Sequence, residues 1–326
     1  MLKESPSLAL AFRQMVKDAS SVVIGSHINP DGDSLGSALA VSHYLDQLGV
    51  ENEVLTHHLA PRNLMFLPGV ERLRQAPRSE KHDLGIMVDL DALERLGSVE
   101  PYFSICPRLI VVDHHVPHQA PGDLRIIDVE APATSLILTR MLLEIDAEIT
   151  PAMATCLLTG IVTDTGSFRF RNTTPESLSL SAQLLERGGD INLVSEEIFQ
   201  SNTLAATRLF GHMLDTMRLE CKNQIAMGVL AMRDYENAQA LDEDTEGFVN
   251  EMLFIECVKI AAILREPNPG RVRCSIRSRH DIDVAAVARE FGGGGHVNAA
   301  GCTFDLPLAE AEAVLMARLK RCLGSC

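Results

Sequence analysis

Short apolar runs alternate with amphipathic stretches through the first half of the chain. The runs at residues 21–25, 84–89 and 109–113 are short and rich in Val, Ile and Leu, so they predict buried strands. Apolar residues at helical spacing predict helices over residues 34–48, 133–145, 151–162 and 176–187. Strands that alternate with helices indicate a parallel sheet covered on both faces, and we therefore expect an α/β domain.

The pattern changes in the second half of the chain, where it predicts a smaller mixed sheet with helices. The predicted elements are a hairpin at 214–221 and 224–230, strands at 256–264 and 271–277, and a helix at 283–290. Between the two halves, residues 190–213 predict a helical connector. We divide the chain into residues 1–188, a connector at 189–213, and residues 214–326.

Composition places the chain among globular proteins with more than one domain. Of its 326 residues, 46% are hydrophobic and 22% are charged, and no apolar run approaches the ~20 residues that cross a bilayer. Residues 1–16 lack the apolar stretch and cleavage site of a signal peptide. The eight cysteines form no CxxC pair, which favours reduced thiols. We expect a cytoplasmic protein without membrane contact.

The net charge of −15 restricts the partners of the chain. Proteins bind long nucleic acid largely through basic residues on phosphates, and this chain as a whole would repel a polyanion. With no Trp, 3 Tyr and 11 Phe, an extended stacking platform for single strands is also disfavoured. Any nucleic-acid substrate should therefore be short and held locally.

The first candidate site is the sequence HINPDGD at residues 27–33, which lies between a predicted strand and a predicted helix. Ligands of open α/β sheets bind at this kind of junction, at the carboxyl ends of the strands. His27, Asp31 and Asp33 can all face one small volume there. The alternative is a polar turn in which Asp33 or Ser34 caps the helix, and this segment alone does not decide between the two.

Further acids and histidines stand at similar places along the chain. Asp89 ends a predicted strand, Asp113-His114-His115 ends another, and Asp164 follows a helical run. So many carboxylates at one sheet edge would repel one another unless cations bound there. Oxygen ligands mixed with imidazole suit Mn²⁺ or Mg²⁺ better than a thiolate zinc site, and a pair of such ions would suit phosphoryl chemistry.

The second half of the chain carries a candidate anion site. Four consecutive glycines at 292–295 precede His296, and glycine lets backbone N–H groups approach an anion closely. Residues 265–280 hold five arginines against one acid, Glu266. Arginine is well shaped for phosphate. The alternatives are a flexible loop after a helix and a solvated strand face.

These motifs together resemble the DHH phosphoesterase superfamily. The resemblance rests on HINPDGD at 27–33, on Asp89, Asp113-His114-His115 and Asp164, and on RVRCSIRS at 271–278 followed by FGGGGHVNAAG at 291–301, which is similar to the DHH-associated C-terminal domain. It covers nearly the whole chain and is most similar to the bacterial nanoRNase/pAp phosphatase branch. It implies a Rossmann-like DHH domain and a smaller substrate-binding domain.

The resemblance also implies roles for individual residues. One metal ion would be bound by His27, Asp31 and Asp89, and the second by Asp33, Asp89, His114 and Asp164, so that Asp89 would bridge two divalent ions, with Mn²⁺ as the expected metal. Asp113 would orient the histidines and His115 would lie beside the scissile phosphate. The substrate's other phosphate would be bound by Arg277, Ser278, Gly293, Gly294, Gly295 and His296. Arg169 is a weaker candidate for substrate contact.

The implied function is metal-dependent hydrolysis of short oligoribonucleotides or of pAp. A phosphodiesterase of linear or cyclic di-AMP needs the same metals and a similar basic pocket, so it stays open as an alternative. An inorganic pyrophosphatase shares the metal motifs, but the glycines at 292–295 argue against it. A non-catalytic nucleotide-binding module is disfavoured because every candidate ligand is present. The expected partners are short RNA, mononucleotides or dinucleotides, and the sequence is compatible with a homodimer.

Overall fold

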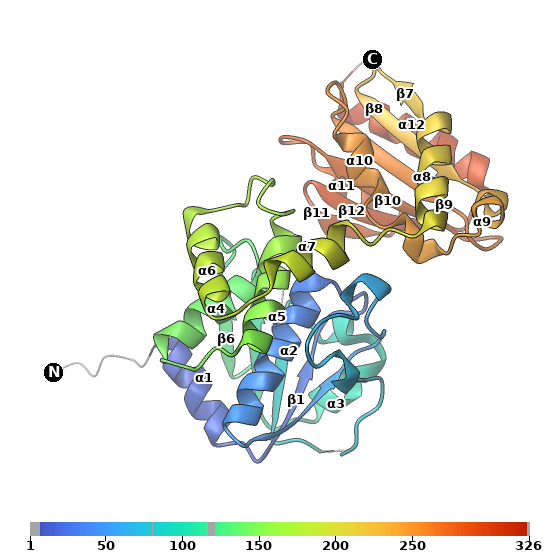
Figure 1. Ribbon diagram of the computed structural model, residues 1–326. Coiled ribbons are helices and arrows are strands. Elements are labelled where there is room, and N and C mark those ends of the chain that lie inside the picture. The colour runs from blue at the N-terminus through green and yellow to red at the C-terminus, as the bar shows by residue number, and fades with distance from the viewer. Residues whose placement is uncertain (1–6, 80, 117–120, 325–326) are drawn as a thin grey trace. The chain divides into compact units, whose positions relative to one another are not determined.

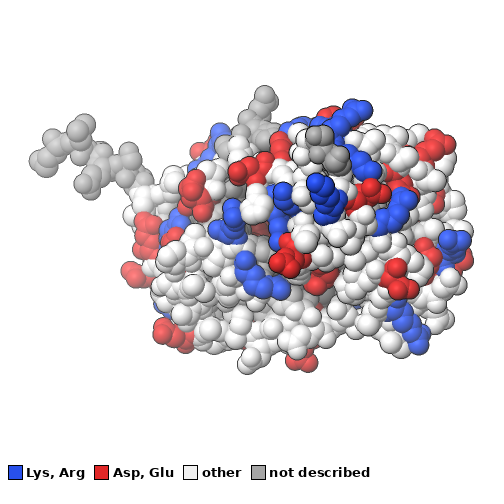
Figure 2. Space-filling view, turned by 90° about the horizontal axis from the view of Figure 1, so that it is seen from above, with Lys and Arg blue, Asp and Glu red and all other residues white. Residues whose placement is uncertain are grey.

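The fold is known from a computed structural model, which describes residues 7–79, 81–116 and 121–324. The chain divides into two units, Met1–Ser201 and Asn202–Cys326, and each is described by itself. Charges of both signs share the surface: Figure 2 shows Lys and Arg side chains interspersed with Asp and Glu on one face. None of the helices in the described ranges combines the length and apolar character that crossing a membrane requires.

The first unit is built on a parallel sheet of six strands in the order β3-β2-β1-β4-β5-β6 (Figure 1). The strands are β1 Ser21–Gly25, β2 Glu51–Leu55, β3 Leu73–Arg74, β4 Leu84–Val88, β5 Leu109–Asp113 and β6 Leu124–Ile127. Its helices are α1 Leu8–Lys17, α2 Gly32–Gln47, α3 Glu100–Ser104, α4 Thr134–Glu144, α5 Pro151–Asp164, α6 Pro175–Glu186 and α7 Ile191–Phe199. The predicted parallel α/β fold is confirmed.

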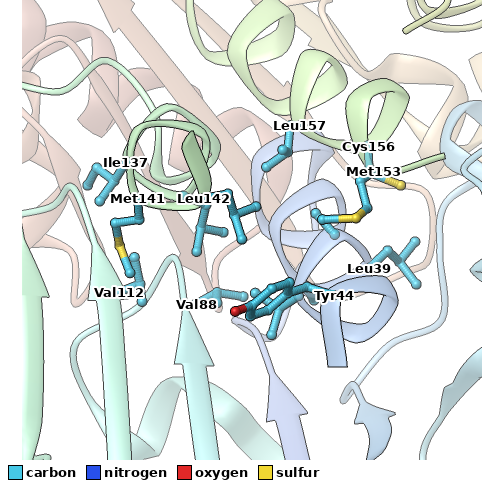
Figure 3. Packing of buried hydrophobic residues seen from close by; sticks show 14 of the residues in the cluster. Leu39, Tyr44, Val88, Val112, Ile137, Met141, Leu142, Met153, Cys156 and Leu157 are labelled. Atoms are coloured by element: carbon cyan, nitrogen blue, oxygen red, sulfur yellow. The ribbon is translucent and has the colours of Figure 1, made fainter. Parts of the chain in front are cut away.

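Both faces of this sheet are buried, which explains why its strands are apolar without alternation. Alternate side chains of β1, β4 and β5 point to opposite faces of the sheet. One set joins the core under α1, α2, α4 and α5, and the other set packs with α3 and Leu96. Figure 3 shows the first core around Val88 and Val112, with side chains from α2, α4 and α5 gathered over the strands.

Helices α2 and α5 approach each other so closely that glycine is required in both. A Cβ atom on Gly36 of α2 would overlap the carbonyl oxygen of Cys156. A Cβ atom on Gly160 of α5 would overlap Ser135 and lie 2.5 Å from Oδ1 of Asp33. The contact therefore brings the start of α2 and the end of α5 to the same place.

Two local predictions differ from the structure. Helix α2 begins at Gly32, and its N-cap is Asp31, which accepts a hydrogen bond from the backbone N–H of Ser34, so neither Asp33 nor Ser34 is the cap. The apolar pattern does not predict β2, because its sequence ENEVL contains three polar residues. Glu53 is nevertheless buried there and lies 2.9 Å from Nε2 of His82, which compensates the burial of its carboxylate.

The second unit contains a mixed sheet of six strands in the order β11-β12-β10-β9-β8-β7. The strands are β7 Arg218–Glu220, β8 Ile225–Leu230, β9 Ile260–Arg265, β10 Val272–Ser278, β11 Gly294–His296 and β12 Ala299–Phe304. Its helices are α8 Leu204–Thr216, α9 Met232–Ala238, α10 Phe248–Leu253, α11 Val284–Glu290 and α12 Leu308–Cys322. The predicted hairpin is formed by β7 and β8, with Lys222 and Asn223 at positive φ in its turn. Its first strand is shorter than the predicted 214–221, because residues 214–216 belong to α8.

The residues of the predicted connector belong to two cores. Val194 of α7 is buried in the core of the first unit, whereas Leu209 and Met213 of α8 are buried in the second.

The prediction of reduced thiols is wrong at Cys221, which is disulfide-bonded. Six other cysteines of the described residues are free: Cys106, Cys156, Cys257, Cys274, Cys302 and Cys322.

Candidate metal centre and substrate-binding residues

The candidate ligands of the first unit gather at one edge of the parallel sheet. Strands β1, β4 and β5 are neighbours and run in the same direction, so their carboxyl ends meet. His27 follows β1, Asp89 directly follows β4, and Asp113 is the last residue of β5. This edge is where open α/β sheets bind ligands.

The loop after β1 brings His27 against two carboxylates. Nε2 of His27 lies 3.2 Å from Oδ2 of Asp89 and 3.5 Å from Oδ2 of Asp31. Burial lowers the pKa of His27, but the hydrogen bonds and charges of Asp31 and Asp89 outweigh burial and raise that pKa to about 10. His58, which the sequence did not indicate, fixes the same loop, because its Nδ1 lies 2.6 Å from the carbonyl oxygen of Ile28.

Asp89 lies at the middle of the cluster and is almost fully buried. Its Oδ1 lies 3.4 Å from Nε2 of His114 and 3.6 Å from Nδ1 of His115, and it accepts a hydrogen bond of 3.2 Å from the Thr134 hydroxyl. Burial raises the pKa of Asp89, but its bonds to His114 and His27 outweigh burial and hold the pKa below the usual range. Its backbone has φ of +60°, a strained conformation of the kind that clusters at functional sites.

Asp33 is fixed by the N-terminus of α4. Its Oδ2 accepts a hydrogen bond of 2.6 Å from the backbone N–H of Thr134, and its Oδ1 accepts one of 2.9 Å from that of Ser135. All three residues are fully buried. Burial, and then the charge of Asp89, raise the pKa of Asp33 to about 7. Thr134 and Ser135 were missed, because they contact Asp33 through backbone N–H groups at the start of α4, which no residue type marks in the sequence.

His114 faces two carboxylates with one ring nitrogen. Its Nε2 lies 3.4 Å from Asp89 and 3.4 Å from Oδ2 of Asp164, while its Nδ1 lies 3.2 Å from the carbonyl oxygen of Ala131. A carbonyl only accepts, so Nδ1 carries the proton and Nε2 is directed at the acids. Burial, and then the charges of Asp33, Asp31 and Asp89, raise the pKa of Asp164 well above its usual value.

Asp113 and His115 form a hydrogen-bonded pair next to the cluster around Asp89. Oδ1 of the fully buried Asp113 accepts hydrogen bonds from the backbone N–H groups of His114 at 2.9 Å and His115 at 3.2 Å. The same oxygen lies 2.7 Å from Nδ1 of His115, which must donate to it. Asp113 thus fixes both the backbone of the DHH sequence and the orientation of the His115 ring.

The donor set fits divalent cations. Three groups of donor atoms lie within 4.8 Å of one another: His27, Asp31 and Asp89; Asp33, His114 and Asp164; and Asp89, His114 and His115. The first two groups correspond to the two predicted ligand sets, and Asp89 reaches the histidine of the second. Burial, and then mutual repulsion, raise the pKa values of Asp33 and Asp164, and bound positive charge would stabilise both carboxylates. Mixed oxygen and imidazole donors suit Mn²⁺.

The predicted substrate residues of the second unit lie on β10 and β11. Arg277 is partly buried, and burial and then the charge of Arg265 lower its pKa. Its guanidinium donates a hydrogen bond of 3.1 Å to the carbonyl oxygen of Ile276, and among the described residues no acid forms an ion pair with it. Ser278 is buried and donates a hydrogen bond of 2.6 Å to the carbonyl oxygen of Ile282. It also accepts one of 2.9 Å from the Asn298 side chain, which the sequence did not indicate. Arg277 and Ser278 therefore differ, because Arg277 is a cation without an ion pair in the described ranges, whereas Ser278 holds a turn.

Close packing against a neighbouring strand requires glycine at some of positions 293–295, apart from any role in binding. Gly294 and Gly295 pair with β12, and a Cβ atom on Gly293 or Gly295 would overlap the backbone of that strand. A Cβ atom on Gly294 would meet nothing within 4 Å, so this position leaves an open approach to the backbone. The side chain of His296 lies outside what the structure describes.

Two family models match the chain in order. The model for the DHH family, N-terminal domain, matches residues 21–161, and the model for the DHHA1 domain matches residues 226–325. A protein of Thermus thermophilus named bifunctional oligoribonuclease and PAP phosphatase NrnA is 33% identical over 282 residues, which cover 86% of this chain and 83% of that protein. The chain belongs to the DHH family. The predicted resemblance is confirmed.

Other similar proteins extend along the whole chain. A probable bifunctional oligoribonuclease and PAP phosphatase NrnA of Streptococcus mutans is 24% identical and covers 91% of this chain and 93% of its own. The crystal structure of an exopolyphosphatase-related protein from Bacteroides fragilis matches with a TM-score of 0.91 and 27% identity, and covers 98% of both chains. This DHH-family chain therefore shares its architecture with proteins of similar length.

Proposed function

We propose that this chain is a metal-dependent phosphoesterase that hydrolyses short oligoribonucleotides, pAp, or both. The observation that carries the proposal is the pair of ligand groups that meet at Asp89. The names of the relatives from Thermus thermophilus and Streptococcus mutans support this choice of substrates. In the proposal, residues 1–188 perform the chemistry, residues 189–213 connect the domains, and residues 214–326 bind substrate.

Two divalent ions, Mn²⁺ by preference, would be bound by the clustered side chains. His27, Asp31 and Asp89 would bind one ion, and Asp33, Asp89, His114 and Asp164 the other. Such ions, when bound, lower the pKa of water toward neutrality and stabilise negative charge on phosphoryl oxygens. The residues that surround the ligands keep this geometry fixed: Thr134 and Ser135 hold Asp33, and Ala131 holds the ring of His114.

His115 is the proposed acid of the reaction. Its Nδ1 donates to Asp113, so Nε2 is the ring atom that can donate a proton or a hydrogen bond to the substrate. The buried Asp113 carboxylate, 2.7 Å from Nδ1, fixes the ring orientation that such donation requires. Asp113 therefore acts as a positioning residue through His115, by orientation.

Arg277 would bind the phosphate that is not cleaved, together with Ser278, Gly293, Gly294, Gly295 and His296. The lowered pKa of Arg277 supports this role, because an anion would compensate its charge. A second phosphate distinguishes pAp and short RNA from simple phosphoesters. This selectivity is the reason for preferring them as substrates.

The test is hydrolysis by the purified full chain with Mn²⁺ of pAp, of dinucleotides, of linear and cyclic di-AMP, and of pyrophosphate. We expect turnover of pAp or dinucleotides at least tenfold above that of pyrophosphate. Turnover of pyrophosphate alone, or of cyclic di-AMP alone, would contradict the proposal. The cytoplasmic location and the homodimer stay predictions, which cell fractionation and light scattering can check.

A further inference from the structure

A strained turn follows directly after the helix that carries Asp164. Gly166, Ser167 and Phe168 have φ values of +55°, +57° and +62° in succession. Non-glycine residues in the left-handed region are uncommon. Two in a row beside a candidate active site indicate that the strained backbone has a functional role. The neighbouring side chains show what the turn achieves.

Thr165 holds the turn together from inside the protein. Its buried hydroxyl donates a hydrogen bond of 2.6 Å to the carbonyl oxygen of Ile161 and accepts one of 3.1 Å from the backbone N–H of Phe168. Its carbonyl oxygen accepts hydrogen bonds of 3.0 Å from the backbone N–H groups of Arg169 and Phe170. These bonds offset the strain, and the side chain of Phe168 packs against the core.

The result is that Arg169 and Phe170 are presented at the surface in a fixed arrangement. Nε of Arg169 donates a hydrogen bond of 2.7 Å to the carbonyl oxygen of Gly166, and its guanidinium lies over the ring of Phe199 at 5.9 Å. The Phe170 ring covers Gly166, where a Cβ atom would overlap it. Phe170 and Phe199 are 42% and 37% exposed, so the planar cation lies over one partly uncovered ring and a second partly uncovered ring belongs to the same turn.

This arrangement is attached to the candidate metal centre. Asn172, just beyond Phe170, donates a hydrogen bond of 2.9 Å from its side chain to the carbonyl oxygen of Asp164. The chain after Asp164 therefore folds back, so that Asn172 contacts the backbone of Asp164 again. A ligand whose phosphate is bound by metal ions that Asp164 helps to hold would have its neighbouring group next to this segment.

We propose that Arg169, Phe170 and Phe199 form a binding site for one nucleobase of the substrate. The proposal rests on the proposed function. Nucleobases stack on aromatic rings and on arginine planes, and such stacking accepts every base because each base has a π face. Three side chains suit a single base, in agreement with a substrate that is short. The site recognises that a base is present, and it does not select which base.

The experiment compares two substrates that differ only in the base, deoxyadenosine 3′,5′-bisphosphate and its abasic counterpart 1,2-dideoxyribose 3,5-bisphosphate. Arg169→Lys keeps the charge but removes the plane, and Phe170→Leu keeps the apolar surface but removes the ring. We expect each variant to lower kcat/KM roughly tenfold to a hundredfold for the substrate with the base, and less than about twofold for the abasic one. Arg171→Lys, a conservative change at an exposed arginine of the same loop, is the control.

Equal losses on both substrates would overturn the proposal, because they would mean that these side chains support the fold or contact phosphate. Unchanged rates on both would overturn it as well. Binding of AMP and of ribose 5-phosphate to the Mn²⁺-loaded protein, measured by calorimetry, separates this proposal from the proposed function. If the wild-type protein hydrolyses neither substrate, the proposed function fails. A preference for AMP that both variants abolish would still support the nucleobase site.

Discussion

Replacing Asp33 by alanine should destabilise the metal-free protein far more than loss of a surface acid would. Asp33 accepts hydrogen bonds from the backbone N–H groups of Thr134 and Ser135, and both of these residues are fully buried. A buried donor left without a partner costs about 1–3 kcal/mol. Two such donors give an expected loss of about 2–6 kcal/mol in the free energy of unfolding.

The size of this loss should depend on pH. Burial and the charge of Asp89 raise the pKa of Asp33 from 3.8 to about 7 in the folded state. A raised folded pKa means that the folded state binds the proton more tightly than the unfolded state. The stability from Asp33 is therefore fully present below pH 3.8 and is lost as the pH rises through about 7. The loss caused by Asp33→Ala should be larger near pH 5 than near pH 8.5, by an amount of the order of a few kcal/mol.

Urea unfolding followed by circular dichroism, with excess chelator at both pH values, measures this loss. The matched control is Asp31→Ala, which also removes a candidate ligand, but from a half-exposed side chain that caps α2. Loss of an N-cap costs about 0.5–2 kcal/mol, so the control should be the milder variant near pH 5. Equal losses in the two variants, or a loss from Asp33→Ala that grows with pH, would refute the reasoning.

Three further outcomes are expected. Chelation of the metal should end hydrolysis. Mn²⁺ at 100 times its Kd should stabilise the first unit against unfolding by about 2.7 kcal/mol per site. Amide hydrogen exchange rates of residues 7–201 that stay the same with and without Mn²⁺ would contradict this. Asp89→Ala and Asp89→Gly should both abolish turnover, but the glycine variant should be about 1 kcal/mol more stable in chemical denaturation, because φ is +60° at this position. Arg277→Ala should lower kcat/KM for pAp roughly tenfold to a hundredfold and change hydrolysis of a simple aryl phosphodiester much less. Equal losses on the two substrates would show that Arg277 supports the fold.

The sequence predicted the position of the candidate ligands because strand ends are visible in the apolar pattern. Asp89 and Asp113 each close a run of apolar residues, and parallel strands bring such positions to one edge. Helix α2 was also found from its apolar spacing, although its first residue was misplaced by the choice of cap. These features depend on local sequence, which is why they could be predicted.

The contacts that hold the ligands could not be predicted, because they join distant parts of the chain. Thr134 donates to Asp33 across 101 residues, and no local pattern pairs them. The positive φ of Asp89 likewise depends on the packing around β4, since aspartate only tolerates that conformation. For Gly293 and Gly295, the sequence suggested anion binding or a flexible loop, whereas close contact with β12 already requires glycine there.

The close contact of α2 with α5 has a consequence for how this protein can change. A single methyl group on Gly160 would lie 2.5 Å from the carboxylate of Asp33 and would overlap Ser135, one of the residues that hold it. A Gly160→Ala substitution would therefore disturb the candidate metal centre without altering any of its proposed ligands. We therefore expect that a chain which keeps all its acids and histidines can still lose its chemistry through a change at this helix crossing.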